Sequence, residues 1–148
     1  MPATRAAVDT VVAYAGLAYP DRPFGQVIGL WYDGVFDLTC TDEILAEYRD
    51  VLLDPQYLSE NDNEIEVEEF LTFAEWFGAH GDPSPDPPPR IRDEHDRIWL
   101  QGAIGTKADY LVTVDPDFLD DIELIREMRA LGVRIAPPYI FLREVVRR

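Results

Sequence analysis

Short apolar runs alternate with longer stretches of helical periodicity along the chain. Four runs are rich in small or β-forming apolar residues, as buried parallel strands are. They predict strands at residues 5–9, 35–40, 110–114 and 133–136. Asp9 closes the first run and Asp115 follows the third. The pattern therefore predicts two buried strands that each lead to an acidic residue.

Helices are predicted between these strands, because apolar residues recur there at helical spacing. The helical stretches are residues 21–34, 41–52, 70–77, 94–105 and 120–131. Thr41 is suited to cap the second helix, and Asp42 and Glu43 are favourable in its first turn. We interpret the strongly acidic segment 59–69 as the solvated start of a helix.

Strands that alternate with helices predict an α/β fold with a parallel sheet covered on both faces. Residues 81–89 contain five prolines, and such a segment forms neither a helix nor a central strand. We interpret it as a stiff loop within one domain, because only about 60 residues follow it, fewer than most independent domains contain. Residues 1–148 are therefore expected to form a single domain.

The charge of the chain limits how it can meet nucleic acid. It has 29 acidic and 13 basic residues, a net charge of −16, and a single lysine, Lys107. Such a balance repels nucleic acid and disfavours a protein that coats it with a basic face. It does not exclude an enzyme whose substrate is bridged by metal cations.

Features of secreted or membrane proteins are missing from the sequence. The single cysteine, Cys40, permits no intramolecular disulfide, and we expect a buried, inert thiol. No apolar stretch approaches the ~20 residues of a membrane span, and the first residues have no apolar signal-peptide region. We expect no membrane partner and a cytoplasmic location.

Four acids are candidates for a shared site. Asp9 and Asp115 lie at the carboxyl ends of strands, where open parallel sheets form their sites. Glu47 lies in the helix after the second strand, and Asp96 begins the helix at 94–105. These acids converge only if the strands of Asp9 and Asp115 are neighbours, which spacing alone does not show.

A group of four carboxylates requires a cation. Two unit charges about 4 Å apart repel by roughly 4 kcal/mol at an effective dielectric constant near 20. Oxygen ligands without clustered cysteine or histidine favour Mg²⁺ or Mn²⁺ over zinc. His80 and His95 do not have the spacing of zinc ligands. The predicted cofactor is therefore Mg²⁺ or Mn²⁺.

Four segments resemble the four motifs of PIN domains, and they follow one another in the family's order. They are residues 7–10 with Asp9, residues 41–52 with Glu47, residues 93–98 with Asp96, and residues 108–119 with Asp115. Together they extend over nearly the whole chain. The resemblance is greatest to the PIN toxins of bacterial and archaeal toxin–antitoxin pairs.

This resemblance implies a three-layer α/β/α sandwich with a central parallel five-stranded sheet. It implies an endoribonuclease that hydrolyses RNA with Mg²⁺ or Mn²⁺, forms homodimers and is held inactive by an antitoxin protein. Asp9, Glu47, Asp96 and Asp115 would be its catalytic and metal-binding residues, with Asp117 assisting or replacing Asp115.

Candidate substrate contacts lie near these acids. The hydroxyl of Thr10 or Thr113 is expected to orient a water or a phosphate oxygen, or else to bond to strand-end backbone. Arg90, Arg92 and Arg97 are the candidates for binding phosphate, the alternative being that they neutralise neighbouring acids. The three tryptophans are expected to pack in the core or at a dimer interface.

Val11 departs from the PIN pattern, and this departure bears on the alternative functions. PIN domains usually have asparagine there, so an alternative is a catalytically impaired PIN-fold binding or regulatory module. A haloacid-dehalogenase-type phosphotransferase would require a second aspartate at this position. A two-component receiver would require a lysine after a late strand, whereas Lys107 precedes it.

Overall fold

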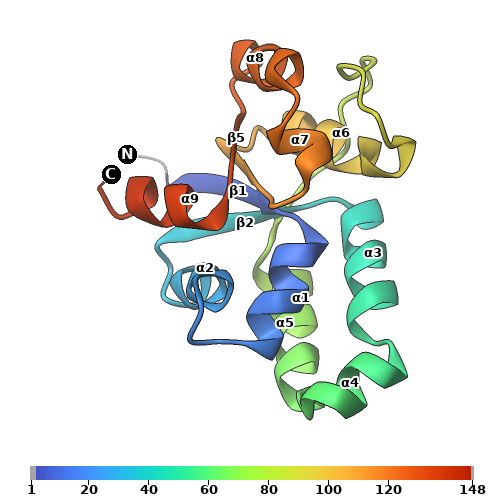
Figure 1. The fold of residues 1–148 in the computed structure, drawn as a ribbon, viewed down its shortest axis with the longest axis vertical. Helices are drawn as coiled ribbons and strands as arrows, with labels where there is room; N and C mark the ends of the chain where they lie inside the picture. The colour runs from blue at the N-terminus through green and yellow to red at the C-terminus, as the bar shows by residue number, and fades with distance from the viewer. Residues whose placement is uncertain (1–2, 148) are drawn as a thin grey trace.

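A computed structural model of the chain describes residues 3–147 and shows a parallel sheet between two layers of helices (Figure 1). Its strands are β1 (Thr4–Val8), β2 (Phe36–Cys40), β3 (Ala79–His80), β4 (Tyr110–Val112) and β5 (Arg134–Ala136). Its helices are α1 (Thr10–Ala18), α2 (Pro23–Tyr32), α3 (Asp42–Leu52), α4 (Pro55–Asn61), α5 (Glu64–Phe77), the 3₁₀ turn η1 (Glu94–Asp96), α6 (Arg97–Gly105), α7 (Pro116–Leu119), α8 (Ile122–Ala130) and α9 (Pro138–Val145).

The five strands are all parallel and lie in the order β3-β2-β1-β4-β5. In the central strand, Ala6 pairs with Leu38 of β2 and Tyr110 of β4. Ala6, Ala7 and Val8 are buried, as expected for a strand covered on both faces. The predicted α/β/α sandwich with a five-stranded parallel sheet is confirmed.

The order of the strands creates a switch point between β1 and β4. The chain runs outward from β1 through β2 to β3, then crosses back to β4 on the other side of β1. Figure 1 shows α1, α2, α3 and α5 on one side of the sheet and α6, α7 and α8 on the other. Ligand sites of open α/β sheets form at such a point, outside the carboxyl ends of the strands.

Helix α1 was not predicted, and it begins directly after β1. Its residues are apolar on nearly every side, so no amphipathic stripe marks it, and Val12, Ala13 and Leu17 are all buried. It packs closely on α2: a Cβ on Gly16 would lie 2.6 Å from the carbonyl oxygen of Phe24. Asp9 is the residue that immediately precedes the first turn of α1.

The structure corrects several other boundaries. The acidic segment 59–69 contains the junction of α4 and α5, where Asp62 takes a positive φ of 49°. The helix expected at 120–131 is α8, Ile122–Ala130, and a short helix that was not predicted, α7, precedes it at Pro116–Leu119. Strand β4 ends at Val112, so that Thr113 and Val114 lie in the following loop. Strand β3 and helix α9 were not predicted.

Helix α9 belongs to the core although prolines precede it. Pro138 occupies its first turn, where a missing N–H costs nothing. Phe141 meets the rings of Phe36 and Tyr110 edge-on, at centroid distances of 5.0 Å each. Within residues 3–147, no helix has both the length and the apolar character needed to cross a membrane.

Candidate active site

A cleft of about 410 Å³ lies at the switch point. Its volume is within the range of roughly 300–1,000 Å³ that is typical of small-ligand sites. Its lining consists of Asp9, Thr10, Val11, Tyr14, Glu47, Val51, Asp96, Trp99 and Asp115. All four acids proposed from the sequence therefore face one cleft. The neighbouring positions of β1 and β4, which the sequence left open, bring Asp9 and Asp115 together.

Asp9 is buried and is held by a hydroxyl. Only 5% of the residue is exposed, and Thr113 Oγ1 donates a hydrogen bond of 2.7 Å to Asp9 Oδ2. Burial raises the pKa of Asp9 to about 6. The bond from Thr113 opposes this shift, whereas the charges of Glu47 and Asp115 add to it.

Thr113 also fixes Asp115. Its Oγ1 accepts the backbone N–H of Asp115 at 3.1 Å, and Asp115 Oδ1 accepts the N–H of Asp117 at 2.9 Å as the cap of α7. The hydroxyl of Thr113 thus joins the acids that follow β1 and β4. This side chain orients carboxylates, a role that the sequence did not suggest.

Glu47 is oriented by two donors from other elements. Its Oε2 accepts the hydroxyl of Thr10 and, at 3.1 Å, the indole N–H of Trp99. Trp99 is 1% exposed and packs in the core as predicted, and Trp31 is also buried, whereas Trp76 is 75% exposed. The contribution of Trp99 to the site was missed, because sequence spacing cannot show that its N–H reaches α3.

Asp96 is the acid of the cleft that most needs a ligand from outside the protein. Its Oδ2 is buried and, within residues 3–147, has no hydrogen-bond donor. Burial raises its pKa to about 7, and the charges of Asp115 and Asp9 add to this rise, followed by Asp93 and Asp117. It precedes α6 without capping it through its side chain. Asp96 is therefore placed for interaction with something other than the protein.

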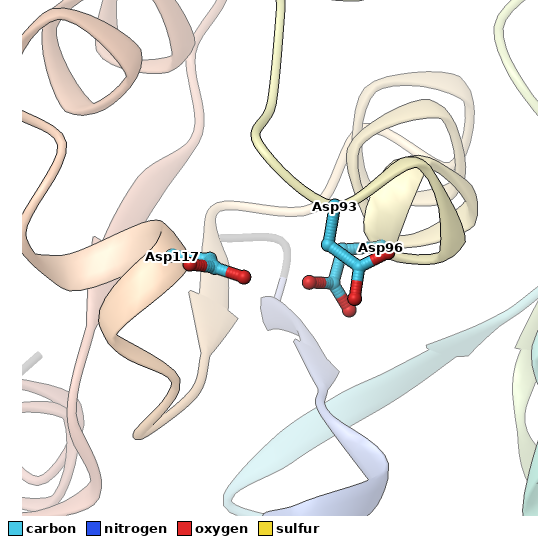
Figure 2. A group of neighbouring side chains, drawn as sticks. All are labelled: Asp93, Asp96 and Asp117. Carbon is cyan, nitrogen blue, oxygen red and sulfur yellow. The ribbon is translucent and has the colours of Figure 1, made fainter.

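Asp96 also belongs to a second acidic group. Oxygen atoms of Asp93, Asp96 and Asp117 lie within 4.8 Å of one another. Figure 2 shows Asp117 projecting from the start of α7 towards Asp93 and Asp96, which come from the turn before α6. Asp93 was not among the predicted ligands. Its position three residues before Asp96, on one helical turn, is the signal that indicates it.

The donors of the site suit a hard divalent cation. They are carboxylate oxygens, the ligands that Mg²⁺ and Mn²⁺ prefer. The buried Asp96 Oδ2, which has no hydrogen-bond partner in the described part of the chain, is a free ligand position. Burial, together with neighbouring acids, raises the pKa values of Asp9 and Asp96, so the protein does not compensate the charge of their ionised forms. The residues present therefore fit a Mg²⁺ or Mn²⁺ ion.

The three arginines proposed as phosphate ligands lie outside the lining of the cleft. Arg92 pairs with Asp117 at 3.6 Å, and Arg97 pairs with Glu94 at 3.6 Å. Arg90 is exposed at the end of the proline-rich loop, in a separate surface hollow that Arg97 also lines. Arg92 is the one of the three that contacts an acid of the metal-binding groups.

Replacing Thr113 with valine should disturb two acids at once. The partly buried N–H of Asp115 would lose its acceptor, at a cost of roughly 1–3 kcal/mol, and Asp9 would lose the hydrogen bond that lowers its pKa. We expect lower unfolding free energy and an Asp9 pKa above 6, measured by chemical denaturation and by carboxyl NMR titration. Thr113→Ser retains the hydroxyl and should behave like wild type; equal losses in both variants would assign the effect to the methyl group.

Comparisons with curated proteins and with solved structures gave no match. A family model of the PIN domain matches residues 5–117. The match runs from β1 to the start of α7, so it includes Asp9, Glu47, Asp96 and Asp115. It also covers well over half of the chain. The chain therefore belongs to the PIN-domain family.

Proposed function

We propose that the protein is a metal-dependent endoribonuclease and that Asp9, Glu47, Asp96 and Asp115 are its metal-binding catalytic residues. The observation that carries this proposal is the convergence of these four acids on one cleft, where Asp96 Oδ2 is buried and has no hydrogen-bond partner among residues 3–147. Membership in the PIN-domain family supports nuclease chemistry.

Some side chains of the cleft bind the metal ion, and others position these ligands. Asp9 and Asp96 are the principal ligands, and Glu47 and Asp115 complete the site directly or through water. A bound Mg²⁺ or Mn²⁺ ion would neutralise charge on the scissile phosphate and lower the pKa of coordinated water. Thr113 holds Asp9, while Thr10 and Trp99 hold Glu47, so the carboxylates are oriented before substrate arrives.

The acids of the second group extend this site. Asp117 lies near Asp96, and its backbone N–H donates a hydrogen bond to the side chain of Asp115. It therefore assists Asp115 as a ligand, with Asp93 alongside. Arg92, paired with Asp117, is the basic residue we propose for contacting a phosphate at this edge.

Cleavage of a labelled single-stranded RNA tests the proposal. We expect fragments with Mn²⁺ or Mg²⁺ and none with excess EDTA. Asp96→Asn purified identically is the control for contaminating nucleases. A wild-type protein that binds Mn²⁺ but leaves every RNA intact would overturn the nuclease function.

We further propose that this nuclease is the toxin of a toxin–antitoxin pair, acts in the cytoplasm as a homodimer and is inhibited by a protein antitoxin. The basis is the resemblance of its four motifs to PIN toxins. Induced expression should stop the growth of a bacterial host, and the Asp96→Asn variant should not. Growth arrest that persists in this variant would exclude RNA cleavage as its cause.

Val11 favours a second candidate, a PIN-fold binding or regulatory module with impaired catalysis. It lines the cleft beside Asp9 and is 51% exposed, so an asparagine fits there without disturbing the core. If the missing amide limits catalysis, Val11→Asn should raise metal-dependent cleavage by about 2- to 10-fold, the value of one added hydrogen bond. The measurement is kcat on the same RNA, with Val11→Leu as control. Unchanged or lower activity in a folded Val11→Asn variant would show that the site does not use this position.

A further inference from the structure

One part of the cleft is not acidic. Val11 and Tyr14 lie three residues apart on α1, and Val51 lies one turn beyond Glu47 on α3. All three are partly exposed, at 51%, 38% and 37%. The cleft thus continues from the carboxylates onto an apolar surface. From Asp9 to Tyr14 the helix advances roughly 7 Å, a distance that a single nucleotide can span.

Tyr14 is held rigidly at this surface. Its ring stacks on Tyr57, with centroids 3.9 Å apart and planes inclined by 29°. The Tyr57 hydroxyl donates to the carbonyl of Tyr14 at 2.6 Å and accepts the amide N–H of Asn63 at 3.1 Å. Asn63 in turn donates to the carbonyl of Leu17 at 3.2 Å. Because Tyr57 covers one face of Tyr14, the other face is the one available to a ligand.

The charge of the cleft makes such a surface important. Among residues 3–147, no lysine or arginine lines the cleft, and the chain carries a net charge of −16. The side chains that line the cleft therefore do not neutralise the phosphates of an RNA strand, and Arg92, the proposed phosphate contact, lies outside this lining. Base stacking on an aromatic ring is a large contribution that needs no positive charge.

We propose that Tyr14 is a stacking platform for a nucleobase next to the scissile phosphate, and that it selects single-stranded RNA. This inference rests on the proposed nuclease function. A base stacks on a protein ring only when it is splayed out of its own helix, so a paired strand is excluded. Stacking tolerates every base, so Tyr14 selects strandedness and not sequence.

Binding of an RNA that carries 2-aminopurine tests the platform without relying on cleavage. The fluorescence of this base is quenched when it stacks. In rapid mixing with Mn²⁺, wild type and Tyr14→Phe should quench a single-stranded oligonucleotide, and Tyr14→Leu should not. Leucine still covers Tyr57, so the fold is retained where alanine would leave a gap. Equal quenching by the leucine variant would overturn the proposal.

Kinetics provide the second measurement. Stacking is made equally in the bound substrate and the transition state, so its loss changes KM and not kcat. We expect Tyr14→Leu to raise KM about 10-fold with kcat within about twofold of wild type. Tyr14→Phe should restore KM. Tyr19→Leu is the matched control, because Tyr19 is 60% exposed at the end of α1 and outside the cleft.

The two proposals fail in different ways. If wild type cleaves RNA but Tyr14→Leu keeps the wild-type KM, or duplex RNA is cut as fast as single strands, Tyr14 is not a platform and the nuclease function stands. If wild type cleaves no RNA yet quenches 2-aminopurine through Tyr14, the platform stands and the nuclease function falls.

Discussion

Asp96→Asn is expected to reduce metal-dependent RNA cleavage by at least about 100-fold, since even outer-shell changes at metal sites cost 10- to 100-fold. The substitution retains the shape of the side chain and removes one ligand charge. Asp96 does not cap α6 through its side chain, and its Oδ2 has no protein partner among residues 3–147. Loss of activity would therefore arise at the metal and not from unfolding.

Thermal unfolding separates these causes. Metal at about 100 times its dissociation constant stabilises a protein by ~2.7 kcal/mol, and Mn²⁺ should raise the Tm of wild type far more than that of Asp96→Asn. Asp37→Asn is the control, because Asp37 is an exposed acid near the opposite end of β2. Equal Mn²⁺ shifts in wild type and Asp96→Asn would remove Asp96 from the metal site, and a strongly destabilised metal-free variant would give it a structural role.

Asp9→Asn should stabilise the metal-free protein at pH 8 and leave its stability nearly unchanged at pH 4. Burial raises the pKa of Asp9 from 3.8 to about 6, so the native state binds a proton more tightly than the unfolded state does. The stability from this proton is complete below pH 3.8 and is lost as the pH rises through about 6. A pKa shift of this size corresponds to a difference of about 3 kcal/mol in unfolding free energy between low and high pH.

Comparing the unfolding free energies of wild type and Asp9→Asn isolates this effect, because groups that titrate alike in both proteins contribute equally and cancel in the difference. Asparagine still offers an oxygen to Thr113, so the hydrogen bond to Asp9 is retained in kind. Urea unfolding at pH 4, 6 and 8 in EDTA gives the difference in unfolding free energy. A constant difference across this range would mean that Asp9 titrates normally.

The strand-end acids could be found from the sequence because their chemistry is local. Asp9 directly follows an apolar strand, and Asp115 follows β4 after a two-residue loop. Thr41 was likewise predicted as a cap, and its hydroxyl accepts the N–H of Ile44. Each feature depends on neighbours within a few residues, and hydrophobic periodicity reports such relations.

Other features depend on contacts between distant segments. Periodicity does not give the strand order, which makes β1 and β4 neighbours and forms the cleft. Strand β3 has only two residues, too few for any alternating pattern. Helix α1 lacks a polar face, so the sequence shows no helical periodicity there. For this reason Tyr14 was not predicted to line the same cleft as Asp9.

Both edges of the sheet end in ways that discourage edge-to-edge aggregation. Strand β3 forms one edge with two residues and leads into the proline-rich segment 81–89, and β5 forms the other with three residues followed at once by Pro137 and Pro138. Short edges and prolines offer few free backbone groups to another chain. Two copies of this protein would therefore not join their sheets into a continuous one, and the expected homodimer would have to form through its helices.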